Sequence, residues 1–180
     1  MAKRTTAAKP TTPTPVRPDP SKQRYNFVLN PYPDSRCSTC PTCGKPTGQR
    51  KVPLFIHIEP RYPIILGYTC RHCVTCNLLI AHKHEIEANL TQLFRQNAPG
   101  VIGNAYLVMG VMPRQTWRAG MENPQSPHEV IDQLAKFLSY TILQRTRGGW
   151  FPAGVTPPLE PAPPSTTWVK ADKGSVPRRR

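Results

Sequence analysis

The six cysteines of this chain limit its fold more than any other feature, because they lie in two clusters with the same spacing. The clusters are Cys37, Cys40 and Cys43, and Cys70, Cys73 and Cys76. A Cys-x2-Cys pair lets two thiolates reach one tetrahedral ion from a tight loop, at about 2.3 Å from zinc. Two such pairs in one chain indicate a zinc site with four thiolate ligands. Such a site is structural, since it leaves no coordination position open for water or substrate.

The residue that follows each Cys-x2-Cys pair helps to choose among the six cysteines. The backbone turns sharply there, which favours a residue that tolerates a positive φ. Gly44 follows Cys43 and Asn77 follows Cys76, whereas Arg and Val follow the other two cysteines of the second cluster. We therefore predict that one structural Zn²⁺ is held by Cys40, Cys43, Cys73 and Cys76. The alternates are Cys37 and Cys70, and the main alternative set takes Cys70 and Cys73 as its second pair.

Other uses of the six cysteines stay open. Three disulfides would pair all of them, although the first residues lack the apolar segment of a secretion signal. Two zinc ions sharing thiolates would also use more than four cysteines. An iron–sulfur cluster is a further option, but neither cluster has ferredoxin spacing.

The apolar pattern predicts strands around the middle of the chain. Residues 51–58 alternate between apolar and polar, and residues 64–69 follow a turn, so the two segments are expected to form a β-hairpin between the cysteine clusters. Residues 105–112 are expected to form a buried strand that ends at a proline.

Two helices are also expected, which makes the predicted fold class α+β. From Leu78 the apolar residues recur at spacings of three and four, which predicts a helix ending near Pro99. Cysteines of the second cluster would lie at the start of this helix, whose positive end stabilises thiolates. Ser126 is expected to cap a long C-terminal helix, with Glu129 in the capping-box position and an apolar face reaching Ile142.

Two short motifs carry a family resemblance, and they are Cys40-Pro-Thr-Cys43-Gly44-Lys45 and Cys73-Val-Thr-Cys76-Asn77. A knuckle, a hairpin and a helix with the second ligand pair resemble the treble-clef and zinc-ribbon class. More closely, the chain looks like an uncharacterised bacterial zinc-ribbon-like family over about residues 40–140. This likeness is carried by Trp117 and by four segments: Pro53-Leu-Phe-Ile-His57, Thr69-Cys-Arg-His-Cys73, Leu78-Leu-Ile-Ala-His82 and Tyr106-Leu-Val-Met-Gly110. The chain departs from that family at Val74 and Asn77, where proline and an acid would be expected. The resemblance implies no particular activity.

Prolines and basic residues concentrate at the two ends of the chain. Residues 1–24 hold six basic residues, one acid and five prolines, and residues 151–180 hold five basic residues, two acids and seven prolines. Such segments bury too little apolar surface to offset the entropy of ordering. We therefore expect a disordered basic arm at 1–24, a zinc-binding domain at 25–150 and a disordered basic tail at 151–180. Trp168 is either a docking residue or a solvated side chain.

The charge balance favours an anionic partner, because 24 Lys and Arg face 10 Asp and Glu, a formal net charge of +14. Arg114, Trp117 and Arg118, near Arg95, combine a stacking surface with phosphate-binding groups. These features predict a module that binds nucleic acid or a ribonucleoprotein surface. The longest apolar stretch is far shorter than the ~20 residues of a membrane span. A basic, Pro- and Thr-rich start is unlike a signal peptide, so we expect a cytoplasmic protein.

Two other functions stay open. A protein–protein adaptor would use the Pro-rich tails as linkers or docking peptides. A metal or thiol redox enzyme would use Cys37, Cys70 or His57. Paired acids, a Ser-His-Asp set and a Gly-rich phosphate loop are missing, so we expect no enzyme and no small-molecule substrate. His82 and His84 would point about 200° apart on a helix, so they are not expected to chelate together.

Overall fold

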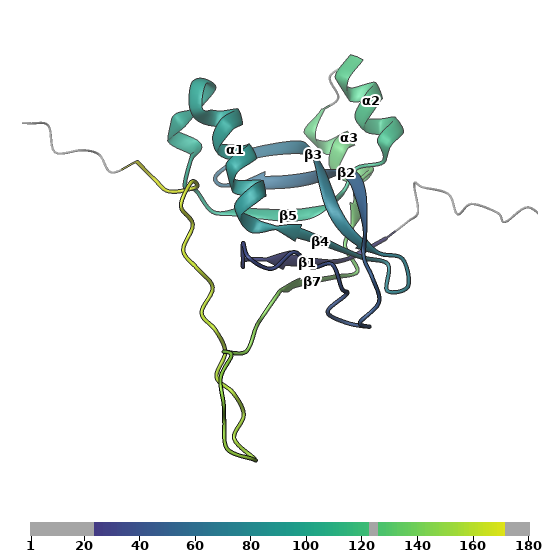
Figure 1. The fold of residues 1–180 in the computed structure, drawn as a ribbon. Helices are drawn as coiled ribbons and strands as arrows, with labels where there is room; N and C mark the ends of the chain where they lie inside the picture. Colours follow the sequence, from purple (N-terminus) through teal and green to yellow (C-terminus); the bar gives the residue numbers. More distant parts are fainter. Residues whose placement is uncertain (1–23, 123–125, 172–180) are drawn as a thin grey trace, which may run out of the picture.

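The computed structural model describes residues 24–122 and 126–171, which form a curled seven-stranded sheet with helices on its faces (Figure 1). The strands are β1 (Asn26–Asn30), β2 (Gly48–Ile58), β3 (Tyr62–Cys73), β4 (Leu78–His82), β5 (Tyr106–Val111), β6 (Ala135–Lys136) and β7 (Ser139–Ile142). The helices are α1 (Lys83–Asn97), the short 3-10 helix η1 (Pro99–Val101), α2 (Arg114–Glu122) and α3 (Pro127–Asp132). Apart from Arg24, the basic arm predicted for residues 1–24 lies outside the described residues.

The sheet has the strand order β6-β5-β2-β3-β4-β1-β7. β2 and β3 pair antiparallel from Gly48 opposite His72 to Ile58 opposite Tyr62, so the predicted hairpin is confirmed with longer strands. β5 adds to β2 antiparallel, which confirms the strand predicted at 105–112. β1 lies parallel between β4 and β7, a pairing that the apolar pattern did not indicate.

The first predicted helix begins at Lys83 rather than at Leu78. Leu78–His82 is β4, a strand that is buried at every position between β1 and β3. A strand covered on both faces reads as an unbroken apolar run, which periodicity does not separate from the first turn of a helix. The second cysteine pair therefore borders a turn between two strands, and its predicted place at a helix start is wrong.

The last predicted helix starts as expected. The Ser126 hydroxyl accepts a hydrogen bond from the Glu129 amide (3.4 Å), and the Glu129 carboxylate accepts one from the Ser126 amide (3.0 Å). This reciprocal pair is the predicted capping box, and it begins α3.

The same helix ends at Asp132, far short of Ile142, and the apolar segment that follows forms β6 and β7 instead. The ring of Phe27 on β1 stacks on Phe137, with 4.4 Å between centroids, and lies 5.3 Å from the ring of Tyr140. Packing against β1 therefore outweighs the helical spacing of this segment, because cross-strand aromatic contacts stabilise the strand pairing.

Alternate residues of β2 cover opposite faces of the sheet. Leu54 and Ile56 are fully buried in the main core, where α1 contributes Ile86. Phe55 belongs to a second cluster, on which Trp117 of α2 packs. The helices α1 and α2 therefore lie on opposite faces. Within the described ranges, none of the helices is long and apolar enough to cross a membrane.

The stretch 151–171 differs from the disordered tail expected from its composition. Figure 1 shows the chain leaving β7, running away from the sheet and returning alongside itself towards α1. Arg145 Nε donates to the Glu160 carboxylate (2.5 Å) within this excursion. Trp168 is 6% exposed, and its indole Nε1 donates to the Asn104 carbonyl (2.7 Å). One buried tryptophan supplies an anchor that average composition does not reveal.

Candidate metal centre

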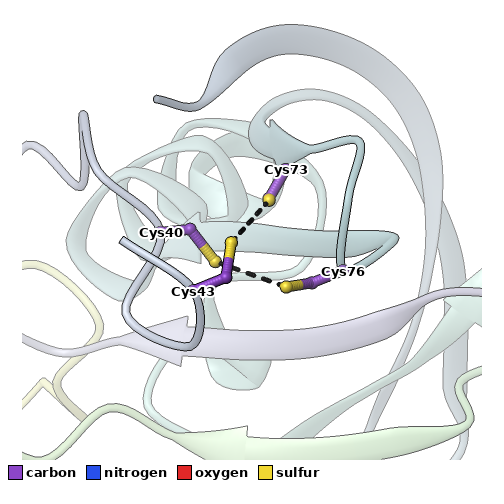
Figure 2. A group of neighbouring side chains, drawn as sticks. All are labelled: Cys40, Cys43, Cys73 and Cys76. Carbon is purple, nitrogen blue, oxygen red and sulfur yellow. Dashed lines mark hydrogen bonds between the residues drawn. The ribbon is translucent and has the colours of Figure 1, made fainter. Parts of the chain in front are cut away.

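Four cysteines from two separate loops come together in the structure (Figure 2). Cys40 and Cys43 lie in the loop between β1 and β2, and Cys73 and Cys76 border the turn between β3 and β4. Their Sγ atoms all lie within 4.8 Å of one another. These are the four cysteines that the sequence favoured. Among the described residues, they are the one group of three or more Cys, His, Asp or Glu side chains close enough to hold a metal ion.

The spacing of the sulfur atoms fits a tetrahedral zinc ion. The Sγ–Sγ distance is 3.6 Å from Cys43 to Cys73 and 3.9 Å from Cys40 to Cys76, the two pairs joined by dashed lines in Figure 2. Four sulfurs at about 2.3 Å from one ion lie about 3.8 Å apart in a tetrahedron. A disulfide would hold its sulfurs at about 2.05 Å. The donor set and its spacing therefore suit a single zinc ion better than disulfide pairing.

The first cysteine loop is a tight backbone turn. The Cys40 amide donates to the Lys45 carbonyl (2.8 Å), and the Gly44 amide donates to the Cys40 carbonyl (2.9 Å). Gly44 has a φ of +68°, a conformation that glycine adopts without steric cost. This is the positive φ that the sequence predicted after Cys43.

The second cysteine loop also turns at a residue with a positive φ, which is asparagine in place of glycine. Asn77 has a φ of +47°, and its amide donates to the Val74 carbonyl (3.3 Å). The start of β1 secures this loop, because the Asn26 side-chain amide donates to the Cys76 carbonyl and the Asn26 backbone amide donates to the Asn77 carbonyl, both at 3.0 Å. Sequence reasoning missed Asn26, whose role depends on the parallel pairing of β1 with β4.

The thiols of the cluster do not ionise alike. Burial opposes ionisation of Cys40, but the amides of Cys43 and Thr42 and the neighbouring thiols outweigh burial and lower its pKa to about 7. Hydrogen bonding to Cys43, burial and the charge of Cys40 raise the pKa of Cys76 to about 12. The negative charge of one thiolate therefore raises the pKa of the next thiol. A divalent cation between the sulfurs would instead lower the pKa values of all four thiols.

The two alternate cysteines lie outside the cluster. Cys70 is fully buried in the main core, and burial, followed by the charge of Glu85, raises the pKa of its thiol. Cys37 has a φ of +47°, and its Sγ lies 3.5 Å from the Asn30 side-chain amide and 3.6 Å from the Ser35 hydroxyl. The structure therefore does not place either thiol in the four-sulfur group.

The residues predicted to contact nucleic acid divide between two faces of the sheet. Arg114, Trp117 and Arg118 lie on α2, whereas Arg95 lies in the last turn of α1. Because α1 and α2 cover opposite faces, the expectation that Arg95 lies near the other three is wrong.

The α2 residues lie against both strands of the hairpin, β2 and β3. Trp117 lies over Gly67, where an added Cβ would be 3.2 Å from the indole, so the ring is half-buried rather than free in solvent. Arg114 Nη2 donates to the Lys51 carbonyl (2.6 Å). We call Lys51, Arg114, Trp117 and Arg118 the α2 surface. Sequence reasoning missed Lys51, although the adjacent basic residues 50 and 51 were a visible signal.

Fold and site together define an α+β protein with a curled seven-stranded sheet and a four-cysteine cluster compatible with a structural metal site. No protein-family model, curated protein sequence or solved structure matches this chain. The expected zinc-ribbon-like family therefore receives no support from these comparisons, and functional inference depends on the chain's own residues.

Proposed function

We propose that Cys40, Cys43, Cys73 and Cys76 bind one structural zinc ion. The observation that carries this proposal is the meeting of four Sγ atoms from two loops within 4.8 Å. The positive charge of zinc would stabilise four neighbouring thiolates. Four protein ligands would leave the ion no coordination position for substrate. Its role would be to join the β1–β2 loop to the β3–β4 turn.

Metal content tests this proposal directly. The full-length chain, purified without chelators, is expected to contain one equivalent of zinc. Cobalt substitution is expected to give the visible spectrum of a tetrahedral thiolate site. A content of two zinc equivalents would favour two ions that share thiolates. The absorption spectrum of an iron–sulfur cluster in the purified protein would refute the zinc assignment and indicate a redox centre.

We further infer that the α2 surface contacts a nucleic-acid backbone. Lys51, Arg114 and Arg118 are exposed cations on one face, around the half-buried indole of Trp117. The chain's net charge of +14 would add attraction that is independent of sequence. Cations attract phosphates, and an aromatic ring among them offers a stacking surface for a base.

Replacing Arg114 and Arg118 by glutamine is expected to weaken binding of the full-length chain to mixed single-stranded oligonucleotides about tenfold at low salt. The slope of log K against log salt is expected to fall by about 1.4, because each lost phosphate contact on a single strand removes about 0.7 released counterions. Fluorescence anisotropy across a salt series measures both quantities.

The matched control carries the same charge change elsewhere, with Arg95→Gln on α1 and Arg147→Gln beyond β7. Both side chains are exposed in the structure. This variant is expected to keep most of the affinity at the same salt concentration. Equal loss in the two double variants would mean general charge attraction and would refute a dedicated α2 surface.

A protein–protein adaptor is the second candidate, because an apolar groove borders the α2 surface. A cavity of about 380 Å³ lies between the hairpin and the helices α2 and α3, lined in part by Phe55, Ile65, Met112, Trp117 and Met121. Met121 is 66% exposed. Exposed apolar surface of this kind suits apolar side chains of a protein partner. Nucleic-acid binding that disappears with modest salt would move this candidate to first place.

A thiol redox enzyme built on Cys70 is disfavoured by the structure. A reactive cysteine needs a stabilised, accessible thiolate. Cys70 has no exposed surface, and its thiol pKa is raised by burial and by Glu85.

A further inference from the structure

A second, polar pocket lies away from the cysteine cluster, at the start of α1. Its volume is about 450 Å³, and its walls come from the loop after β1, the hairpin strands and the first turn of α1. We call it the α1 pocket. The lining residues that matter chemically are Ser35, Arg36, Arg71, His82, His84 and Glu85.

The first turn of α1 borders this pocket through His84 and Glu85. The first amides of a helix have no partner within the helix, and aligned peptide dipoles give this end a partial positive charge. His82 occupies the N-cap position, but its side chain does not cap these amides. Anions are the ligands that such a helix end favours.

The two histidines line the same pocket. The Asn30 side-chain amide also donates to the Tyr32 and Ser35 carbonyls, which identifies its nitrogen, and it lies 2.9 Å from His82 Nδ1. Burial is the main cause that lowers the pKa of His82 below its ordinary value. The charge of Glu85 opposes this shift, and the positive charges of His84 and Arg71 add to it.

His84 presents an unused nitrogen next to His82. Its Nδ1 is buried and has no hydrogen-bond partner in the part of the chain that the structure describes. The His82 and His84 rings lie 5.7 Å apart between centroids, close enough to approach one ligand. Their expected opposite directions were wrong because His82 ends a strand and His84 belongs to the helix. His84 therefore brings a hydrogen-bonding group to the lining of the pocket that no side chain or backbone group of the described residues uses.

Two guanidinium groups give the pocket its charge. Arg71 is held by Thr47, because its Nε donates to the Thr47 hydroxyl and its Nη2 donates to the Thr47 carbonyl, both at 3.1 Å. This leaves Nη1 for a ligand in a fixed orientation. Arg36 is exposed at the rim. Arginine forks match the oxygen geometry of phosphate and carboxylate groups.

Glu85 narrows the choice of anion. One of its carboxylate oxygens accepts a hydrogen bond from the Tyr68 hydroxyl (2.5 Å). A carboxylate in an anion pocket repels sulfate, which has no proton at neutral pH. A phosphate group with a proton can instead donate a hydrogen bond to that carboxylate.

We propose that the α1 pocket binds a phosphate group, as the free ion or as a monoester. The α1 amides, the two imidazoles and the two guanidinium groups would bind its oxygens, and the Glu85 carboxylate would accept a hydrogen bond from its protonated oxygen. The site shares no residue with the α2 surface, so it goes beyond the nucleic-acid proposal and is tested separately from it.

The test is a titration of the full-length chain with inorganic phosphate, followed by the ring signals of the histidines in NMR spectra. The His82 and His84 signals are expected to shift and saturate, while His57 on β2 serves as an internal control. Sulfate at the same ionic strength is expected to bind at least about fivefold more weakly. Absence of saturation, or equal affinity for sulfate, would overturn the assignment.

Matched variants locate the binding. Arg71→Gln is expected to weaken phosphate at least about tenfold, as loss of a charge-assisted pair does. Arg71 also bonds Thr47, so Arg36→Gln, which changes an exposed side chain, is the second variant, with about threefold weaker binding expected. Arg95→Gln at the other end of α1 is the control and should bind as the parent chain does. Equal weakening by Arg95→Gln and Arg36→Gln would refute the site.

Two further ligands separate the possible sources of the phosphate. Methyl phosphate and a 5′-phosphorylated oligonucleotide are compared with inorganic phosphate, with the unphosphorylated oligonucleotide as reference. Tighter binding of the monoesters would identify an ester as the ligand, and tighter binding of the inorganic ion would identify free phosphate. Either order supports the pocket, and equal affinity for the two oligonucleotides together with binding of the inorganic ion supports free phosphate. Binding of neither inorganic phosphate nor methyl phosphate overturns the pocket.

Discussion

Serine in place of Cys43 is expected to abolish stoichiometric zinc binding and to unfold both cysteine loops. Structural zinc in small domains contributes on the order of 10 kcal/mol of apparent binding free energy, so loss of one ligand removes a large part of it. The β1–β2 loop and the β3–β4 turn belong to different parts of the chain, and the sulfur group joins them. Hydrogen exchange is expected to accelerate at least about a hundredfold in residues 38–48 and 73–78.

The rest of the sheet should respond much less. β2, β3 and β5 are paired over long registers, and their main core with α1 does not include the four cysteines of the cluster. The control is Cys37→Ser, which changes a cysteine outside the sulfur group and should retain one zinc. Loss of zinc in both variants would refute the assigned ligand set. Acidification acts in the same direction as Cys43→Ser, because protons compete with zinc for thiolates.

Alanine in place of Trp168 is expected to lower the free energy of unfolding by about 3 kcal/mol, the lower end of the range for large aromatic residues in cores. The indole is 6% exposed, with ring centroids 6.1 Å from Tyr106 and 6.3 Å from Phe94, and it bonds the Asn104 carbonyl. Gly103 makes this packing possible, because a Cβ there would lie 2.2 Å from the backbone nitrogen of Lys170.

Two neighbouring hydrogen bonds should fail together with the indole contact. The Thr91 hydroxyl donates to the Thr167 carbonyl (3.2 Å), and the Ser165 hydroxyl donates to the Glu87 carboxylate (3.0 Å). Limited proteolysis of the Trp168→Ala variant is therefore expected to cut within residues 151–171 faster than in the parent chain.

Trp150→Ala is the matched control for this prediction. Its side chain is 86% exposed, so the free energy of unfolding should change by less than about 0.5 kcal/mol. Chemical denaturation measures both variants. An unchanged free energy of unfolding in the Trp168→Ala variant would mean that docking of the C-terminal stretch does not stabilise the domain.

The cysteine cluster was predictable because its signals are local. The positive φ after each Cys-x2-Cys pair depends on two or three neighbouring residues, and Gly44 and Asn77 both adopt it. The hairpin followed from alternation along β2, and the α3 cap followed from the spacing of Ser126 and Glu129. In each case, the atoms that determine the conformation lie within a few residues of one another or across a single turn.

The α1 pocket was not predictable in the same way. His82 and His84 were visible in the sequence, but their approach depends on the boundary between β4 and α1. Arg71 and Arg36 come from other elements and meet the histidines through the pairing of β3 with β4 and the course of the loop after β1. Such long-range contacts have no signature in a local pattern.

The sequence by itself determined the two cysteine turns, the hairpin between them and the first turn of α3, because each is stabilised by nearby groups. Only the tertiary structure decided that residues 78–82 form a strand, that residues 135–142 join the sheet and that Trp168 docks beside α1. These segments are apolar enough for more than one local conformation. Burial against β1, β3 and α1 selects the observed one, since each contact joins residues that are far apart in the chain.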